Sequence, residues 1–297
     1  MMLEEIKYHL KGKIKKGTIL YSLLRGGYRI IYTPSCLYPF LRSQSLTTKV
    51  LGPRLTRSRT FIEIDITYRC NLGCFNCNRS LGQKQAPSNE EMTVEQIEKF
   101  VQESRINQVK WKRIHVVGGE PTLHPHFLEI LSILLEYKQN YSPDTLILVT
   151  SNGYGEKVNE ILKKVPSQIA ISNTLKESKE QRFHPFNQAP KDSIFYKYTD
   201  YSNGCPILQL CGMGLTPYGY YHCAVAGSID RIFGFDKGRK VLPSQEDSMG
   251  ELLQTFCPLC GHFKCGVISN HTIMSPTWDL AYKEYKQLNR RRTLSLY

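Results

Sequence analysis

The sequence predicts an α/β fold: a partial, TIM-type parallel barrel followed by a small cysteine-rich extension. Between about residues 60 and 173, a strand-like stretch gives way to a helix-like stretch in repeated alternation, the pattern of βα units with parallel pairing and right-handed crossovers. Polar and glycine-rich residues follow the predicted strands, at the edge where such barrels place their active sites. Six cysteines lie beyond residue 204 and mark the extension.

The strands are predicted from short apolar runs, the first of which alternates apolar and polar residues as a half-buried strand does. The four clear segments are Phe61–Thr67, Arg113–Val117, Thr145–Val149 and Gln168–Ser172. A fifth strand is expected at Ile194–Tyr198.

The intervening helices are predicted from apolar residues at helical spacing. The first helix begins near Thr93, where Gln96 three residues later completes a capping box. The expected inward-facing residues of the three helices are, in order, Ile97, Phe100 and Val101; Phe127, Ile130, Leu131, Leu134 and Leu135; and Val158, Ile161 and Leu162.

Composition limits the class of protein. At 297 residues the chain can hold one α/β domain and an appendage. No run of eighteen apolar residues occurs, so no transmembrane segment is expected. The apolar stretch Ile19–Leu41 is interrupted by Arg25, Arg29 and Pro34 and lacks a secretory cleavage pattern. Ten cysteines could form disulfides in a secreted protein, but a cysteine triad and a later C-x2-C favour metal ligation in a reducing compartment, so we expect a cytoplasmic protein.

The net charge of +13 is concentrated at the N-terminus. Residues 1–60 hold twelve Lys or Arg and two Glu, a net charge of +10, which leaves +3 for the rest of the chain. Such a basic segment suits an acidic protein, an anionic membrane surface, a phosphorylated substrate or nucleic acid, or it is simply a solvated extension. No nucleic-acid-binding motif accompanies it, so a nucleic-acid partner is not expected.

The most informative motif is a cysteine triad, Cys70, Cys74 and Cys77, in the loop after the first strand. A four-iron cluster is commonly held by four thiolates. A C-x3-C-x2-C triad without a nearby fourth cysteine would leave one iron open for chemistry, as catalytic zinc sites keep an open position. A zinc site is the alternative that spacing alone allows.

Two later strands end in further motifs. The second strand runs into Gly118-Gly119-Glu120-Pro121, and the third into Thr150-Ser151-Asn152-Gly153. The triad and both endings, in this order and spacing, resemble the radical S-adenosylmethionine (SAM) superfamily over about residues 60–173. The resemblance implies a partial (β/α)6 barrel.

The resemblance also implies roles for these residues. The three cysteines would ligate a [4Fe-4S] cluster, and the Gly118–Pro121 turn, through Gly118, Gly119 and Glu120, would hold the methionyl amino group of SAM. Ser151, Asn152 and Ser172 would contact the ribose or carboxylate. Many members carry an aromatic residue directly before the third cysteine, whereas this chain has Asn76.

The implied reaction is reductive cleavage of SAM to methionine and a 5′-deoxyadenosyl radical, which takes a hydrogen atom from the substrate. The electron would come from a flavodoxin or ferredoxin. A small metabolite, such as a sugar, nucleotide or amino acid derivative, is the expected substrate. The alternatives are a radical SAM maturase acting on a peptide or protein and, last, a non-catalytic zinc-binding protein.

The downstream cysteines resemble a shortened SPASM or twitch extension, a module that binds auxiliary iron–sulfur clusters. They are Cys205, Cys211, Cys223, Cys257, Cys260 and Cys265, with a glycine-rich segment suited to a hairpin between the second and third. We expect one auxiliary [4Fe-4S] cluster held by the first three and one of the last three. Two clusters, or a zinc knuckle that includes His262, are the alternatives.

These observations predict three regions. Residues 1–59 form a basic N-terminal extension, residues 60–203 the radical SAM core, and residues 204–297 the auxiliary-cluster extension with a C-terminal helix.

Overall fold

The computed structural model describes residues 37–81, 90–179, 186–264, 274–288 and 294–297. Its centre is a six-stranded sheet with the order β4-β3-β2-β1-β5-β6. The strands are β1 (Phe61–Thr67), β2 (Arg113–Gly118), β3 (Leu146–Ser151), β4 (Ala170–Asn173), β5 (Met213–Thr216) and β6 (Gly219–Tyr221). Neighbouring strands from β4 to β5 are parallel, and only β6 is antiparallel to its neighbour. The sheet is open, which confirms the predicted α/β fold of a partial barrel.

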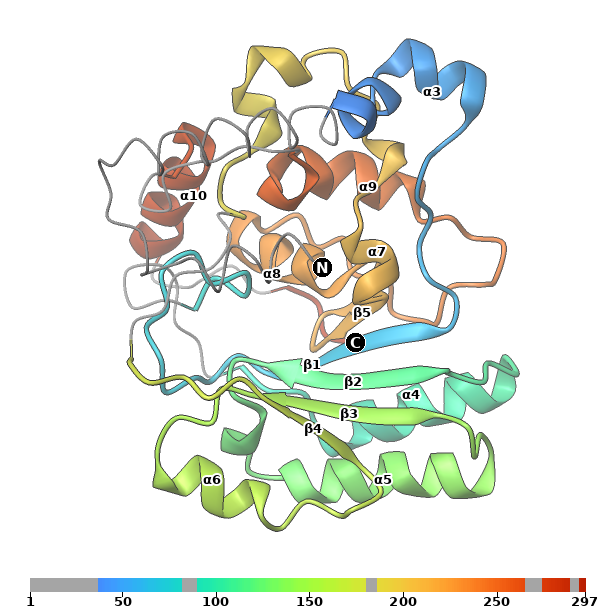
Figure 1. The fold of residues 1–297 in the computed structure, drawn as a ribbon, viewed down its shortest axis with the longest axis vertical. Coiled ribbons are helices and arrows are strands. Elements are labelled where there is room, and N and C mark those ends of the chain that lie inside the picture. Colours follow the sequence, from blue (N-terminus) through green and yellow to red (C-terminus); the bar gives the residue numbers. More distant parts are fainter. Residues whose placement is uncertain (1–36, 82–89, 180–185, 265–273, 289–293) are drawn as a thin grey trace, which may run out of the picture.

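Helices α4 (Val94–Ile106), α5 (Phe127–Asn140) and α6 (Glu156–Leu162) cover one face of the sheet (Figure 1). The predicted capping box is present: the Thr93 side chain accepts from the Gln96 amide, and the Gln96 side chain accepts from the Thr93 amide. The inward residues predicted for α4 and α5 are all buried. In α6, Val158 and Leu162 are buried.

The opposite face of the sheet carries the C-terminal part of the chain (Figure 1). The helices of this layer are α7 (Ile207–Leu210), α8 (Ala224–Phe233), α9 (Gly250–Phe256) and α10 (Pro276–Gln287), and α3 (Ser45–Leu51) lies at its edge. Short 3-10 turns connect the elements: η1 (Pro121–Leu123), η2 (Pro190–Asp192), η3 (Ile194–Tyr196), η4 (Tyr201–Asn203), η5 (Cys257–Leu259) and η6 (Gly261–Phe263).

The predicted strand at Ile194–Tyr198 is wrong. The segment forms the turn η3, directly after the proline-led turn η2, and only Tyr196 points into the core while Ile194 and Phe195 are exposed. Short apolar runs do not distinguish a strand from an irregular turn by periodicity.

The fifth parallel strand is β5, which pairs with β1 from Ile62↔Met213 to Ile64↔Leu215. It forms a hairpin with β6, as the glycine-rich segment predicted. At Gly214 an added Cβ would lie 2.3 Å from the Ala224 amide nitrogen, so the close approach of α8 requires glycine. The first hairpin after residue 204 therefore completes the central sheet.

No helix of the described residues combines the length and apolar character needed to cross a lipid bilayer.

Candidate functional site

The cysteine loop follows β1 and brings its three sulfurs towards one another. Cys74 is buried, and Cys70 and Cys77 are partly exposed. Burial, helped by the nearby Cys77, Glu120 and Cys74, raises the pKa of Cys70 to about 12. A thiol with such a raised pKa stays protonated unless a cation offsets the charge, as a coordinated metal does. The donor set therefore fits a metal cluster.

Asn76, the position that departs from the family pattern, has a backbone reason to be asparagine. Its φ angle is 57°, in the left-handed region, which asparagine tolerates better than an aromatic residue does. Its side chain is fully buried. The loop thus reaches Cys77 through a tight reversal that favours asparagine over a bulkier side chain.

The Gly118–Pro121 turn packs directly on the cysteine loop. The Gly119 amide donates to the Thr67 carbonyl (2.7 Å) and the Glu120 amide to the Arg69 carbonyl (2.9 Å). A Cβ at Gly118 would lie 2.3 Å from the Thr67 oxygen, and one at Gly119 would lie 2.2 Å from the Arg69 oxygen. The two glycines allow the backbones of both loops to touch. Pro121 is buried and opens η1.

The Glu120 carboxylate joins the ends of β2 and β3. It accepts hydrogen bonds from the Ser151 hydroxyl (2.9 Å), the Asn152 amide (2.7 Å), and the Thr122 hydroxyl (2.8 Å). Burial raises the pKa of Glu120, and these donors act against that effect. The third strand's ending is therefore held by the glutamate of the second.

Hydrogen bonds also connect the Ser151–Asn152 ending to the cysteine loop. The Asn152 side chain donates to Asn71 Oδ1 (2.8 Å), and Asn71 Nδ2 donates to the Tyr154 carbonyl (2.7 Å). The cysteine loop, the Gly118–Pro121 turn and the Ser151–Asn152 ending thus form one interlocked unit, which we call the strand-end unit. Ser172 lies outside it: its side chain is exposed on β4, with no hydrogen bond to the unit in the described residues.

Beneath this unit, the sheet carries a buried polar network that the sequence analysis missed. His115 Nδ1 lies 3.2 Å from Glu63 Oε2, and His115 Nε2 lies 2.7 Å from Thr150 Oγ1. Arg79 bonds Glu63 and, at 2.9 Å, Asp65. The sequence signal for this network was the pair of acidic residues at alternate positions of β1. Their partners could not be predicted, because they depend on the strand register, in which Glu63 lies opposite His115.

The pKa values of the two carboxyl groups in this network are shifted in opposite directions. Burial opposes ionisation of Glu63, but Arg79 and His115 outweigh it and lower its pKa to about 2. Burial raises the pKa of Asp65 to about 6, and Arg79 offsets only part of that effect. The network therefore contains one permanently charged carboxylate and one that titrates near neutral pH.

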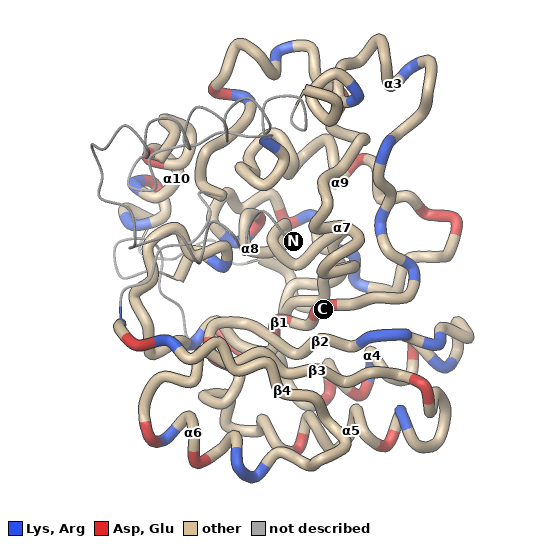
Figure 2. Tube along the Cα trace, in the orientation of Figure 1, with Lys and Arg blue, Asp and Glu red and all other residues tan. Residues whose placement is uncertain are grey.

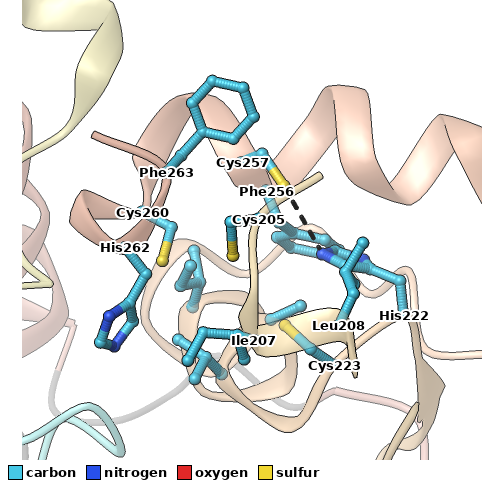
Figure 3. Close-up of a pocket in the computed structure, with 13 residues that line it drawn as sticks. Cys205, Ile207, Leu208, His222, Cys223, Phe256, Cys257, Cys260, His262 and Phe263 are labelled. Carbon is cyan, nitrogen blue, oxygen red and sulfur yellow. Dashed lines mark hydrogen bonds between the residues drawn. The ribbon is translucent and has the colours of Figure 1, made fainter. Parts of the chain in front are cut away.

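A second cysteine group lines a pocket on the opposite layer (Figure 3). Cys205 precedes α7, Cys223 caps α8, and Cys257 and Cys260 flank η5. All four are buried, and the charges of neighbouring cysteines add to burial in raising the pKa values of Cys223, Cys257 and Cys260. We call this set the four-cysteine pocket.

The pocket has a histidine beside one sulfur. His222 Nε2 lies 3.8 Å from the Cys257 sulfur, as the dashed line in Figure 3 marks. Burial lowers the pKa of His222 to about 3, so the ring is neutral at physiological pH. His262 also lines the pocket.

This grouping differs from the set expected from the sequence. Cys211 does not line the pocket; it ends α7 on the side of Glu63, whose charge adds to burial in raising its pKa to about 12. Two tail cysteines, Cys257 and Cys260, take part where one was expected. Cys265, like Cys36, lies outside the described residues. No three His, Cys, Asp or Glu side chains of the described residues are grouped closely enough to hold a single metal ion.

The histidines after the Gly118–Pro121 turn have local roles. His124 Nε2 is bonded to the Met92 carbonyl (2.8 Å) and is buried, and His126 pairs with Glu129 (2.8 Å) at the surface.

Residues 64–187 match the model of the radical SAM superfamily. A probable GTP 3′,8-cyclase of Pyrococcus horikoshii is 34% identical over 104 residues, 35% of this chain and 30% of the relative. A GTP 3′,8-cyclase of Desulforamulus reducens is 27% identical over 108 residues, 36% of this chain and 32% of the relative.

The aligned regions thus span about a third of the curated relatives' length. Among solved structures, that of BtrN in complex with AdoMet and 2-DOIA is 12% identical with a TM-score of 0.40, and the match covers 74% of this chain and 98% of BtrN.

Proposed function

Residues 64–187 form a radical SAM domain, the catalytic domain of an enzyme, and from this premise we propose that the chain cleaves SAM reductively and acts on a small polar metabolite. The observation that carries the proposal is the strand-end unit. Hydrogen bonds there join the buried Glu120 and the loop that carries the three cysteines to the Ser151–Asn152 ending.

In this proposal Cys70, Cys74 and Cys77 hold a [4Fe-4S] cluster and leave one iron for SAM. When bound, the cluster and SAM supply an electron and a 5′-deoxyadenosyl radical, chemistry that the protein itself cannot perform. The chain's contribution is position: Glu120 fixes the β3 ending, and the glycines fix the turn against the cysteine loop. The same turn would hold the methionyl amine, because a carboxylate pairs with an ammonium. Ser151 and Asn152, and further out Ser172, would meet the ribose or carboxylate.

The four-cysteine pocket would hold an auxiliary [4Fe-4S] cluster. Its four buried thiols match the usual ligand number of such a cluster. Four protein ligands leave no iron open, so this cluster would exchange electrons and would not bind substrate. Cys211 is then available for another role, beside Glu63.

The substrate proposal rests on the polar network under the strand-end unit. His115 and Thr150 are only partly buried, and a polar wall of this kind suits a hydroxyl-bearing metabolite such as a sugar, nucleotide or amino acid derivative. The relatives named GTP 3′,8-cyclase support testing nucleotides first. A flavodoxin or ferredoxin would supply the electron, in the cytoplasm, where thiols stay reduced.

The direct test is SAM cleavage by anaerobically reconstituted full-length protein with dithionite, measured as 5′-deoxyadenosine and methionine. We expect turnover by the wild type and none by the Cys70→Ala/Cys74→Ala/Cys77→Ala variant. The matched control is Cys211→Ala, because Cys211 lies outside both cysteine groups. This variant should still cleave SAM in the assay, which contains no substrate. A wild type that carries iron but never yields 5′-deoxyadenosine would contradict the proposal.

A further inference from the structure

An exposed apolar surface lies along one edge of the molecule, at the top of Figure 1. It is formed by the helical residues 37–42, by α3 and by the segment from η3 to residue 198. Each of its members is a large apolar side chain that is at least half exposed: Leu37, Tyr38, Leu41, Leu46, Val50, Leu51, Ile194, Phe195 and Tyr198. We call this set the apolar edge. Contiguous apolar surfaces of this kind mark interaction sites.

The apolar edge is held on a fixed frame. The Ser45 amide donates to the Tyr198 carbonyl (2.8 Å), and the Asp200 amide donates to the Ser43 carbonyl (2.8 Å). Thr48, on the inner face of α3, is buried and bonded to Asn203. Two segments about 150 residues apart in sequence are therefore locked together, with their apolar side chains projecting outward.

The inner side of the same segments packs against the core of the protein. Phe40 packs edge-to-face on Tyr196 (5.7 Å between ring centroids), and Tyr196 and Tyr201 pack on Phe263, which lines the four-cysteine pocket. The outward side chains contribute nothing to this core. Leu46 is 78% exposed and Ile194 is 81% exposed, so they protrude from the surface.

The charges around the apolar edge are mostly positive. Residues 37–60 contain five Lys or Arg and no Asp or Glu, as the blue positions along and after α3 in Figure 2 illustrate, and four of the five reach the surface because Arg57 is buried. Lys49 lies exposed next to Val50, and Lys197 lies exposed between Phe195 and Tyr198. Two acidic residues lie nearby and stay ionised: Asp192 accepts from Thr277, and Asp200 from Ser202 and Gln254, and these hydrogen bonds outweigh burial and lower the pKa of each carboxyl. Residues 1–36, which lead into Leu37, add seven Lys or Arg against two Glu.

We propose that the apolar edge docks on the surface of an anionic lipid bilayer. Aliphatic and aromatic side chains that protrude between lysines and arginines match the way peripheral proteins enter the headgroup region, where apolar groups insert and basic groups meet acidic lipids. A protein partner is the less favoured occupant, since these side chains are exposed at the surface, whereas protein hot spots are typically packed in pockets. The inference is independent of the proposed catalytic function.

The test is sedimentation of the full-length protein with vesicles of phosphatidylcholine alone or mixed with phosphatidylglycerol. We expect binding to the mixed vesicles that weakens as salt is raised. Leu46→Ser/Val50→Ser/Phe195→Ser should lower partitioning at least about tenfold, because the inserted apolar area is lost. The matched control, Ile106→Ser/Val241→Ser/Leu280→Ser, removes three exposed apolar side chains elsewhere and should change binding less than about twofold.

A charge-reversal pair separates the electrostatic part. Lys49→Glu/Lys197→Glu should weaken binding, and Lys157→Glu/Lys163→Glu on and after α6, with the same change in net charge, should not. Three results would overturn the proposal: no binding of the wild type to either vesicle, equal binding of the wild type and the triple apolar edge variant, or a wild-type dimer that the triple variant converts to a monomer, which would make the edge a self-association surface.

Discussion

At the scale of single residues, Glu120 stands at the centre of the proposed SAM site. Its carboxylate accepts from Ser151, Asn152 and Thr122, so it organises the protein even before a ligand is considered. The same group would accept from the methionyl ammonium. Glu120→Gln tests the charge, although it also replaces one of the two acceptor oxygens by a donor, so a variant that removes an internal hydrogen bond without removing charge is needed beside it.

We predict that Glu120→Gln weakens SAM binding by about ten- to a hundredfold without emptying the cluster. Loss of a charged hydrogen bond costs about 1.5–3 kcal/mol, which corresponds to that range of affinity. Anaerobic SAM titration measures the affinity, and iron content measures the cluster. Thr122→Val is the matched control, since it removes one internal hydrogen bond to Glu120 but no charge and should have a smaller effect. Equal affinities for wild type and Glu120→Gln would reduce Glu120 to a structural role.

Asp65 makes the free energy of unfolding depend on pH. Its folded pKa of about 6 lies above the ordinary value of 3.8, so the neutral form is favoured in the folded state. Stability is therefore lost as pH rises from about 4 to 6. At roughly 1.4 kcal/mol per pKa unit, this loss is on the order of 2–3 kcal/mol.

Urea unfolding at several pH values between 4 and 7 tests this prediction. We expect the free energy of unfolding of the wild type to fall across that window relative to Asp65→Asn, which cannot titrate. Parallel pH profiles for the two proteins would show that Asp65 stays ionised in the folded state.

At the scale of elements, much of the sheet could be predicted from the sequence. β1 was predicted with its observed bounds, and the capping box of α4 is present. Local pattern suffices for such elements, because alternation and caps depend on neighbouring residues. The order of the strands does not depend on neighbouring residues alone. β5 pairs with β1 although it begins 146 residues after β1 ends, and the wrongly predicted strand at Ile194–Tyr198 lies nearer to β1 in the sequence.

The candidate site shows the same division. The cysteine triad and both strand endings were found by motif, but their interlocking through Glu120 and Asn71 depends on how three loops meet. The Glu63–His115–Thr150 network depends on the register between strands, which a single sequence does not specify. The four-cysteine pocket was anticipated only in part, since the direction in which Cys211 leaves α7 is a tertiary feature.

The Gly118–Pro121 turn contacts the cysteine loop at Gly119, where there is no room for a side chain. Gly119→Ala would place a Cβ 2.2 Å from the Arg69 oxygen, a backbone atom that can move only with the cysteine loop. We expect reconstituted protein to lose most of the iron held by the triad and all SAM cleavage. Gly250→Ala, whose Cβ would meet only Ser248 Oγ at 3.4 Å, is the control and should retain both. A Gly119→Ala variant with full iron content would show that the loop tolerates displacement.

At the scale of the whole molecule, the two cysteine groups lie in different segments that pack against the same sheet. The triad follows β1, and the four-cysteine pocket is built by segments around α7, α8 and η5 on the layer over the sheet. β5 ties these segments together, since it pairs with β1 and packs against α8. The C-terminal part is thus built onto the sheet, and removing it would expose the edge of β1.

Because the ligands of the two groups do not overlap, we predict that the clusters load independently. Anaerobically reconstituted wild type should carry about eight irons per chain, as two four-iron clusters. Cys70→Ala/Cys74→Ala/Cys77→Ala should lose about four irons, and Cys205→Ser/Cys257→Ser should lose the other four while SAM cleavage by dithionite persists. Iron analysis with electron paramagnetic resonance of each variant distinguishes the two signals. Zinc in place of iron at the four-cysteine pocket would refute the auxiliary cluster, and loss of all iron in either variant would refute independence, because each site would then need the other to fold.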